Sequence, residues 1–256
     1  MDFTNVATNR AIMSTIRSGR RFFVNEFVAI DGVVTLDEEL SHRIRHVMRL
    51  RDGDLVELTD GLGVALCGRV DLSTKMVTCS VETMTTSAQE DTKLMVAVPL
   101  LKAGNTELVI QKMVELGVAS IHVFRASRSV PRISSRTFNR LQKVTIEAME
   151  QSGRVFLPRL KLCESLQKVL VDLPSVTMFG DFDGQDVAEV LDVMSSINSI
   201  GIVVGPEGGL TESEISLLRD VGALPVSLGN YTLRSETAVI VMTTLSTIYC
   251  DRKSYP

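Results

Sequence analysis

The stretch IGIVVGPEGGLTESEI, residues 200–215, decides the fold of this 256-residue chain. Its first six residues are apolar or glycine, a composition typical of a strand buried on both faces of a parallel sheet. Thr211 and Glu214 have the T-x-x-E spacing of a capping box, which predicts that a helix begins there. The loop between strand and helix consists of Gly205, Pro206, Glu207, Gly208 and Gly209. The three glycines of this loop permit a tight turn and a close approach of a flat ligand, with a purely structural turn as the alternative.

The same alternation of strand and helix extends through the rest of the C-terminal part of the chain. Strands are predicted at 94–100, 120–125, 175–180, 200–205 and 223–229. Helices are predicted at 105–116, 135–151, 185–196, 211–221 and 235–250. Apolar strands that alternate with amphipathic helices predict an α/β domain with a parallel sheet covered on both faces. Because ligands bind such sheets beyond the carboxyl ends of the strands, the loops that follow the strands are the candidate sites.

A second candidate loop follows the last predicted strand. Residues 230–234 lead into a helix that is predicted to begin at Ser235, and Glu236 lies in its first turn, where a carboxylate suits the helix dipole. Residues 237–249 carry no charge, which predicts that this helix is buried, partly against another subunit. Arg234 and Glu236 are therefore candidate functional groups, and a structural ion pair between them is the alternative.

The N-terminal part has another pattern. Strand-like runs occur at 21–27, 55–60, 63–70 and 76–81, with one helical stretch whose apolar positions are Leu40, Ile44, Val47 and Met48. Short strands with a single helix predict a small β-barrel at 20–84. Residues 83–92 are polar and lack apolar periodicity, so we expect a linker at 85–92 and the α/β domain at 93–251. Residues 1–19 form an extension to which we assign no function.

The composition excludes several classes of protein. The sequence has no uninterrupted apolar run of about 18 residues, so we expect no membrane span. Its first 20 residues lack the apolar core of a secretory signal. The four cysteines form no CxxC pair, which predicts free thiols in a cytoplasmic protein.

Metal and phosphate chemistry are disfavoured as well. His42 and His46 have the spacing of two zinc ligands on a helix, but Arg43 stands where the H-E-x-x-H motif requires Glu. No third ligand is apparent, so we expect no metal. The glycine loop lacks the G-x-x-x-x-G-K-[ST] motif of nucleotide hydrolases, and Glu207 would repel a phosphate. Its backbone groups suit the edge of a neutral purine instead.

The charges are segregated along the chain, although the net charge is −4. Residues 41–51 contain four arginines and residues 125–143 contain five arginines and one lysine, with no acid in either run. Residues 172–220 contain ten acids and one base. Because phosphate contacts require a local basic patch rather than a basic pI, the two runs predict RNA contacts. The alternative is an ordinary solvated helix surface.

Taken together, the two loops resemble those of the ribosomal RNA small-subunit methyltransferase E family of the SPOUT class. Gly205–Leu210 matches the family's GPEGGL-type loop, and Leu228–Ala238 matches its LGxRxLRxETA-type loop. Further matching segments are Arg21–Val24, His42–Gly53, Lys112–Val118, Arg128–Val130 and Ala148–Arg154. The resemblance covers about residues 20–250, and Tyr231 stands where the family often has Arg.

This resemblance implies a PUA-like RNA-binding barrel followed by a trefoil-knotted SPOUT domain with a parallel sheet. It also implies S-adenosylmethionine as cofactor, a homodimer, and methylation of N3 of one uridine in the 16S rRNA of the small ribosomal subunit. The cofactor-binding residues carried over from the two loops are Gly205, Pro206, Glu207, Gly208, Gly209, Leu228, Gly229 and Leu233.

Roles in catalysis and RNA binding complete the predicted site. Arg234 is the first candidate to stabilise negative charge on the uracil ring, and Glu236 is a candidate general base or a support for the loop. The predicted RNA contacts are Arg21, Arg43, Arg45, Arg49, Arg51, Arg125, Arg128, Arg132 and Arg136. Two alternatives stay open: a non-catalytic RNA-binding or ribosome-assembly protein with this fold, and a ribose 2′-O-methyltransferase of the same class.

Overall fold

The computed structural model describes residues 20–27, 29–88, 93–102, 104–128, 134–194 and 199–251. The chain forms two compact units. The first comprises Met1–Gln89 and Met149–Leu157, and the second comprises Glu90–Ala148 and Pro158–Pro256. The predicted extension at 1–19 and residues 89–92 of the predicted linker lie outside the described residues.

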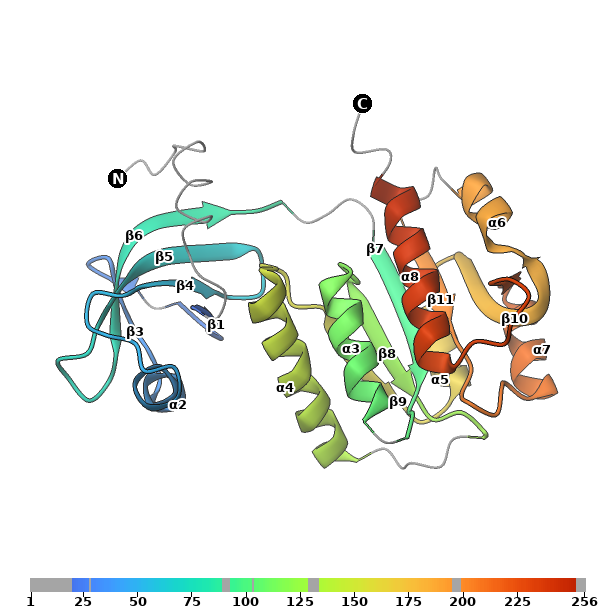
Figure 1. Ribbon diagram of the computed structural model, residues 1–256, viewed down its shortest axis with the longest axis horizontal. Coiled ribbons are helices and arrows are strands. Elements are labelled where there is room, and N and C mark those ends of the chain that lie inside the picture. The colour runs from blue at the N-terminus through green and yellow to red at the C-terminus, as the bar shows by residue number, and fades with distance from the viewer. Residues whose placement is uncertain are drawn as a thin grey trace. The chain divides into compact units, whose positions relative to one another are not determined.

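The first unit contains a six-stranded sheet (Figure 1). Its strands are β1 (Arg21–Phe23), β2 (Ala29–Ile30), β3 (Val33–Thr35), β4 (Leu55–Thr59), β5 (Val64–Asp71) and β6 (Thr78–Thr86). They lie in the order β1-β4-β5-β6-β3-β2; β1 pairs with β4 in parallel, and the other pairs are antiparallel. Apolar side chains from the strands and the adjoining helix form one core that includes Phe22, Leu36, Ile44, Val56 and Leu58, all fully buried.

This sheet differs from the sequence prediction in three places. β1 ends at Phe23 rather than at residue 27. β2 and β3 have two and three residues, which is too short for a recognisable apolar period, so they were missed. β6 runs to Thr86 and pairs there with Val64 of β5, so residues 85 and 86, expected to begin a linker, belong to a strand.

The predicted helical stretch begins with α2 (Glu38–His42), where the Asp37 carboxylate accepts the Leu40 N–H at 2.7 Å and caps the helix. It continues as a π-helix, η1 (Arg43–Val47), in which the Met48 N–H donates to the Arg43 carbonyl at 2.8 Å. The wider π turn changes the spacing of side chains around the helix. Val47, predicted on the apolar face, is consequently 64% exposed.

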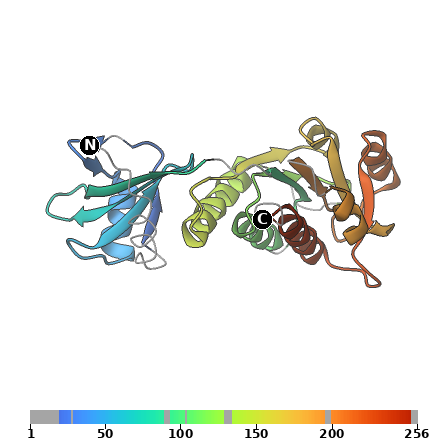
Figure 2. The ribbon, with the colours of Figure 1, turned by 90° about the horizontal axis from the view of Figure 1, so that it is seen from above.

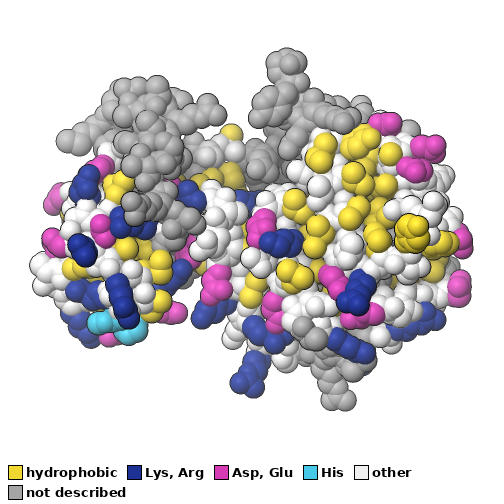
Figure 3. Space-filling view, in the orientation of Figure 1, with side chains coloured by type: hydrophobic (Ala, Val, Ile, Leu, Met, Phe, Trp, Pro, Cys, Tyr) yellow, Lys and Arg dark blue, Asp and Glu magenta, His cyan; other side chains and the backbone are white. Residues whose placement is uncertain are grey.

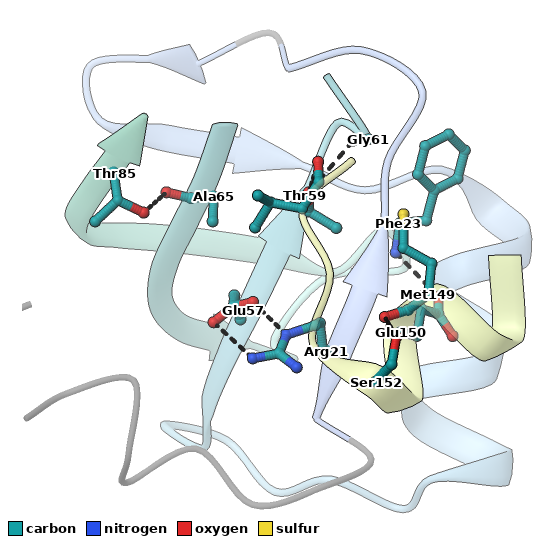
Figure 4. Close-up of polar contacts among 11 residues, drawn as sticks. Arg21, Phe23, Glu57, Thr59, Gly61, Ala65, Thr85, Met149, Glu150 and Ser152 are labelled. Atoms are coloured by element: carbon teal, nitrogen blue, oxygen red, sulfur yellow. Dashed lines mark hydrogen bonds and ion pairs between the residues drawn. The ribbon is translucent and has the colours of Figure 1, made fainter. Parts of the chain in front are cut away.

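Residues 149–157 complete the first unit, although they follow part of the second unit in sequence. The Leu157 N–H donates to the Gly61 carbonyl at 2.8 Å, and the Gly63 N–H donates to the Val155 carbonyl at 3.0 Å. Glu150 accepts the Phe23 N–H at 2.9 Å (Figure 4). The sequence-based division at residue 93 did not anticipate this return of the chain.

The second unit contains a parallel sheet, as predicted. Its strands are β7 (Lys93–Pro99), β8 (Ser120–Phe124), β9 (Arg159–Cys163), β10 (Val176–Asp186), β11 (Ser199–Val203) and β12 (Leu224–Ser227). They lie in the order β12-β10-β11-β7-β8-β9, and every neighbouring pair is parallel. β9 was not predicted. The carboxyl ends of β12, β10 and β11 therefore lie next to one another at one edge of the sheet.

Helices cover both faces of this sheet (Figures 1 and 2). They are α3 (Asn105–Glu115), α4 (Ser135–Ser152), α5 (Leu166–Leu170), α6 (Val187–Met194), α7 (Glu212–Asp220) and α8 (Ser235–Asp251). α8 contacts α3, α6, β7 and β11, whereas α5 contacts α7, β8 and β9. Met95, Phe124, Leu166 and Leu218 form the core under α5 and α7. None of the helices that the structure describes combines the length and low polarity needed to cross a bilayer.

Candidate functional site

The two loops singled out by the sequence line one pocket in the second unit. Its walls come from three adjacent strands: the middle of β10, the loop that follows β11, and the end of β12 with the loop after it. The lining residues are Gly180, Asp181, Phe182, Val204, Gly205, Pro206, Glu207, Gly209, Leu210, Val226, Ser227, Leu228, Gly229, Tyr231, Thr232, Leu233, Arg234, Ser235 and Ala238. The cavity volume is about 380 Å³, which lies within the range of sites for cofactor-sized ligands.

The glycine loop is a tight turn closed by its own backbone. The Gly209 N–H donates to the Pro206 carbonyl at 2.8 Å, and Gly209 has a φ of +71°, a conformation that favours glycine. A Cβ added to Gly205 would lie 3.0 Å from Cγ and 3.1 Å from the backbone nitrogen of Leu210. A side chain at 205 would therefore force Leu210 to shift, and glycine suits the close return of the chain.

The turn ends in the predicted capping box. Thr211 Oγ1 accepts the Glu214 N–H at 3.3 Å, and Glu214 Oε2 accepts the Thr211 N–H at 2.8 Å. Glu214 Oε1 also accepts the Ser127 N–H, at 2.9 Å, from the loop that follows β8. Burial by itself raises the pKa of Glu214, but the hydrogen bonds from Thr211 and Ser127 outweigh it and hold the pKa below its ordinary value. Glu214 is therefore an ionised link between two loops.

The pocket lining combines apolar walls with a few charged groups. Asp181 and Glu207 supply two carboxylates, and Arg234 supplies one guanidinium. Phe182 and Tyr231 also line the pocket and are 61% and 84% exposed. Among the described aromatic residues, these two alone are strongly exposed. The lining thus offers negative charge, apolar surface and two uncovered rings.

Most of the predicted cofactor-binding residues line this pocket, but Gly208 does not. Its carbonyl accepts a hydrogen bond from Arg128 Nη1 at 2.6 Å, and a Cβ at Gly208 would meet the Arg128 side chain at 3.4 Å. Arg234 lines the pocket and is exposed, whereas Glu236 does not line it. Gly208 is therefore part of the loop but faces an arginine rather than the cavity.

Glu236 lies in the first turn of α8, as predicted. Its Oε2 is buried and has no hydrogen-bond partner among the described residues. The ion pair with Arg234 that the sequence left open is not formed within this part of the chain.

Sequence analysis did not predict the part of the pocket wall that β10 contributes. β10 continues past residue 180, where the predicted strand ends, and Gly180, Asp181 and Phe182 line the cavity. The carboxyl-end rule that selected the other two loops applies equally to this strand. Asp181 and Phe182 directly follow the predicted strand, so that rule contained the signal.

Three of the predicted RNA-binding arginines have partners within the first unit. Arg21 pairs with the fully buried Glu57 (Figure 4). Arg43 makes two contacts to Glu150, at 3.0 and 2.5 Å. Arg45 donates to the carbonyls of Leu72, at 2.9 Å, and Thr74. These guanidinium groups hold the first unit together, and RNA contacts at Arg21, Arg43 and Arg45 stay a prediction.

Other basic residues remain on the surface. Arg49 and Arg51 are exposed in the first unit, and Arg125, Arg128 and Arg136 are exposed in the second. Arg132 lies outside the described residues. The rings of His42 and His46, both exposed, are 4.7 Å apart between centroids. Figure 3 shows histidine side chains in cyan with Lys and Arg side chains nearby. The described residues contain no group of three or more potential metal ligands.

Comparison with known proteins agrees with this geometry. Residues 88–247 match the RNA methyltransferase domain family. The ribosomal RNA small subunit methyltransferase E of Bacillus subtilis is 33% identical over 211 residues, which cover 77% of this chain and 82% of that protein. The chain belongs to this family. The protein of the same name from Rickettsia conorii is 26% identical over 86% of this chain and 91% of its own length.

Solved structures of similar proteins have the same fold. The ribosomal RNA small subunit methyltransferase E of Neisseria gonorrhoeae, bound to S-adenosyl methionine, superposes with a TM-score of 0.81 at 25% identity. The match covers 90% of this chain and 97% of that chain. A predicted RNA methyltransferase from Thermotoga maritima superposes with a TM-score of 0.70 at 30% identity, over 92% of this chain and 99% of its own.

Proposed function

We propose that this chain transfers a methyl group from S-adenosylmethionine to N3 of a uridine in the 16S rRNA of the small ribosomal subunit. One observation carries the proposal: the glycine turn after β11 and the arginine-bearing loop after β12 line a single cavity. Membership of the family supports the choice of methyl donor and of ribosomal RNA as substrate. Because the substrate is ribosomal RNA, the proposed place of action is the cytoplasm.

The residues of the pocket fit S-adenosylmethionine. This cofactor carries a positively charged sulfonium and a purine ring, and bound in the pocket it would supply an electrophilic methyl group. Asp181 and Glu207 offer carboxylates to positive or hydroxyl groups, while Val204, Val226 and Leu228 offer apolar surface to the purine. The same two carboxylates disfavour a triphosphate, which argues against a nucleotide hydrolase.

The chemistry of the substrate requires that negative charge on the base be stabilised. N3 of uridine carries a proton, and its lone pair becomes available only when that proton leaves. Arg234, on the pocket wall, has a permanent positive charge and a planar set of donors suited to O2 or O4 of the uracil anion. Glu236, whose buried Oε2 has no hydrogen-bond partner in the described part of the chain, is the candidate to accept the proton or to orient the loop.

The target base must leave its stack to reach such a pocket. Phe182 and Tyr231 present exposed rings at the cavity, and unstacked RNA bases are commonly held by aromatic side chains. Arg49 and Arg51 of the first unit and Arg125 and Arg136 of the second are the proposed phosphate contacts, to which Arg132 is added from the sequence alone.

We further propose that the first unit is a PUA-like barrel and that the second is trefoil-knotted. The curled, mostly antiparallel six-stranded sheet with one helix supports the first assignment. For the second, the chain adds β12 at the edge of the sheet and then returns, so that α8 contacts β7 and β11 near the centre. A return of this kind is compatible with the threading that a knot requires.

A homodimer is part of the proposal, and α8 supports it. Ile240, Val241 and Leu245 are only partly buried, and Ile248 is 46% exposed. Leu108 of the neighbouring α3 is 41% exposed. Hydrophobic side chains gather over this face of the second unit in Figure 3. A second copy of the chain would cover this apolar surface.

Mapping of rRNA modifications by mass spectrometry, in cells with and without the protein, tests the proposal. The expected result is loss of one N3-methyluridine from 16S rRNA, with restoration by the wild-type protein. Unchanged modification, or loss of a ribose methyl group instead, would contradict it. Incubation of the purified protein with labelled donor and either naked 16S rRNA or assembled subunits then identifies the substrate form.

A further inference from the structure

We infer that Arg128 is a positioning residue of the cofactor pocket, which acts through the carbonyl of Gly208, rather than a contact to RNA. The inference rests on the proposed function, because the pocket it concerns is the proposed S-adenosylmethionine site. Arg128 Nη1 donates to the Gly208 carbonyl at 2.6 Å, a short distance typical of a charge-assisted hydrogen bond. The stem of the same side chain covers Gly208, since a Cβ there would lie 3.4 Å from Cδ and 3.5 Å from Cβ of Arg128.

The peptide between Gly208 and Gly209 needs an external restraint. Its two flanking residues are glycines, which allow the peptide plane to rotate at little steric cost. The N–H of this peptide is held by the Pro206 carbonyl at 2.8 Å. The carbonyl of the same rigid plane is held by Arg128. With both polar groups bonded, the plane is fixed, and so are the neighbouring Glu207 and Gly209 on the pocket wall.

The arginine itself is held in place by its neighbour. The Ser127 N–H donates to Glu214 Oε1 at 2.9 Å, and Glu214 is 5% exposed and closes the capping box with Thr211. Arg128 therefore supports the middle of the glycine loop, and its neighbour Ser127 supports the end of that loop through Glu214. An arginine with this support differs from Arg136, for which no side-chain hydrogen bond or ion pair is found among the described residues.

Calorimetric titration with S-adenosylmethionine and steady-state kinetics test the inference. Arg128→Ala should weaken cofactor binding and raise KM for the cofactor about tenfold, as expected for loss of a charged hydrogen bond. KM for RNA and the salt dependence of RNA binding should stay unchanged. Arg128→Lys should restore most of the affinity, because its ammonium can donate to the carbonyl. Arg128→Met keeps an apolar stem without a donor and should behave like Arg128→Ala.

Arg136→Ala provides the matched control and should show the reverse pattern, with weaker RNA binding and unchanged cofactor affinity. The inference is overturned if Arg128→Ala binds the cofactor like wild type, if Arg128→Met does so, or if the loss is confined to RNA binding. The thermal unfolding temperature of each variant without ligand should match that of wild type. If Arg128→Ala and Arg128→Lys both fail to fold, the inference is overturned too. If the wild-type protein itself binds no cofactor, the proposed function fails, and this inference fails with it.

Discussion

Glu150 accepts two hydrogen bonds from Arg43, at 3.0 and 2.5 Å, and a third from the backbone N–H of Phe23, at 2.9 Å. Glu150 lies 107 positions from Arg43 and 127 positions from Phe23 in sequence. The Arg43 guanidinium also lies 5.3 Å from the centre of the Phe22 ring. Because Glu150 is nearly buried, its charge has little access to water. This one carboxylate joins β1, η1 and the end of α4 in the first unit.

Removing the charge of Glu150 should therefore destabilise the first unit. We expect Glu150→Gln to lower the free energy of unfolding by about 2 kcal/mol. The Arg43 guanidinium would then face a buried neutral amide instead of a carboxylate. Urea denaturation measures the effect. Glu82→Gln is the matched control: its partner Arg69 is 2.7 Å away, but both side chains are largely exposed, so the cost should stay below about 1 kcal/mol. Equal effects in the two variants would contradict the argument.

Two glycines of the pocket loop should respond differently to alanine. At Gly205 a methyl group would lie 3.0 Å from Leu210 Cγ, so Gly205→Ala should displace the turn and weaken S-adenosylmethionine binding more than about tenfold. At Gly208 the nearest atoms are 3.4 Å away and belong to the flexible Arg128 side chain, so Gly208→Ala should change affinity less than about threefold. Calorimetry measures both. Equal sensitivity at the two positions would refute this description of the loop.

Arg234 should be needed for chemistry more than for cofactor binding. We expect Arg234→Ala to lower kcat at least about 100-fold, the scale of losing one group that stabilises a developing anion. Affinity for S-adenosylmethionine should change much less. Single-turnover methyl transfer and calorimetry separate the two effects. Glu236→Gln is the informative comparison. A loss of kcat that higher pH relieves, because the N3 proton then leaves without a base, would assign the proton transfer to this carboxylate. Wild-type rates would remove it from the mechanism.

Arg49 and Arg51 should contribute phosphate contacts. The double variant Arg49→Ala, Arg51→Ala should reduce the dependence of log affinity on log salt by about 1.4 to 1.8, since each phosphate contact adds about 0.7 to 0.9. Filter binding at several salt concentrations measures this slope. Arg69→Ala removes a charge from the same unit, but that charge is already paired with Glu82, so its slope should change less. An unchanged slope in the double variant would exclude these residues from the RNA contact.

Stability should fall on mild acidification because of His122. This side chain is 1% exposed, and burial lowers its pKa to about 4, although Asp172, at 3.7 Å, partly opposes the shift and Lys161 and Arg159 add to it. In the unfolded chain the pKa returns to about 6.5, so between pH 6.5 and 4 the unfolded state binds the extra proton. The stability is complete above pH 6.5 and is lost as the pH falls toward 4, by about 3 kcal/mol. The free energy of unfolding, measured by denaturation from pH 7 to 4.5, should fall less for His122→Gln than for wild type.

The parts of the site that sequence predicted are those set by local pattern. Alternating apolar runs predicted the parallel sheet, and the T-x-x-E spacing predicted the cap at Thr211. Parallel strands end at one edge, so the two loops could be expected to meet. The wall at Asp181 was missed although it directly follows the predicted strand, because only the two loops after the strands at 200–205 and 223–229 were selected.

Pairing over long sequence distances was the part that could not be predicted. A count of charges in residues 41–51 treats Arg43 as an unneutralised cation, since Glu150 lies 107 residues away. Arg21 and Glu57 are likewise 36 residues apart. β1, η1 and the returning segment must first be placed by packing before these partners meet, and packing depends on the whole chain rather than on a local window.

The return of residues 149–157 to the first unit has a consequence for biosynthesis. A nascent chain that ends before this segment lacks the partners of Gly61 and Gly63 and the carboxylate that joins Arg43 to Phe23. The N-terminal unit therefore reaches its final packing only after the ribosome has added residues 90–157, and the first strands of the parallel sheet are made during this time. Translation order and folding order are thus interleaved in this protein.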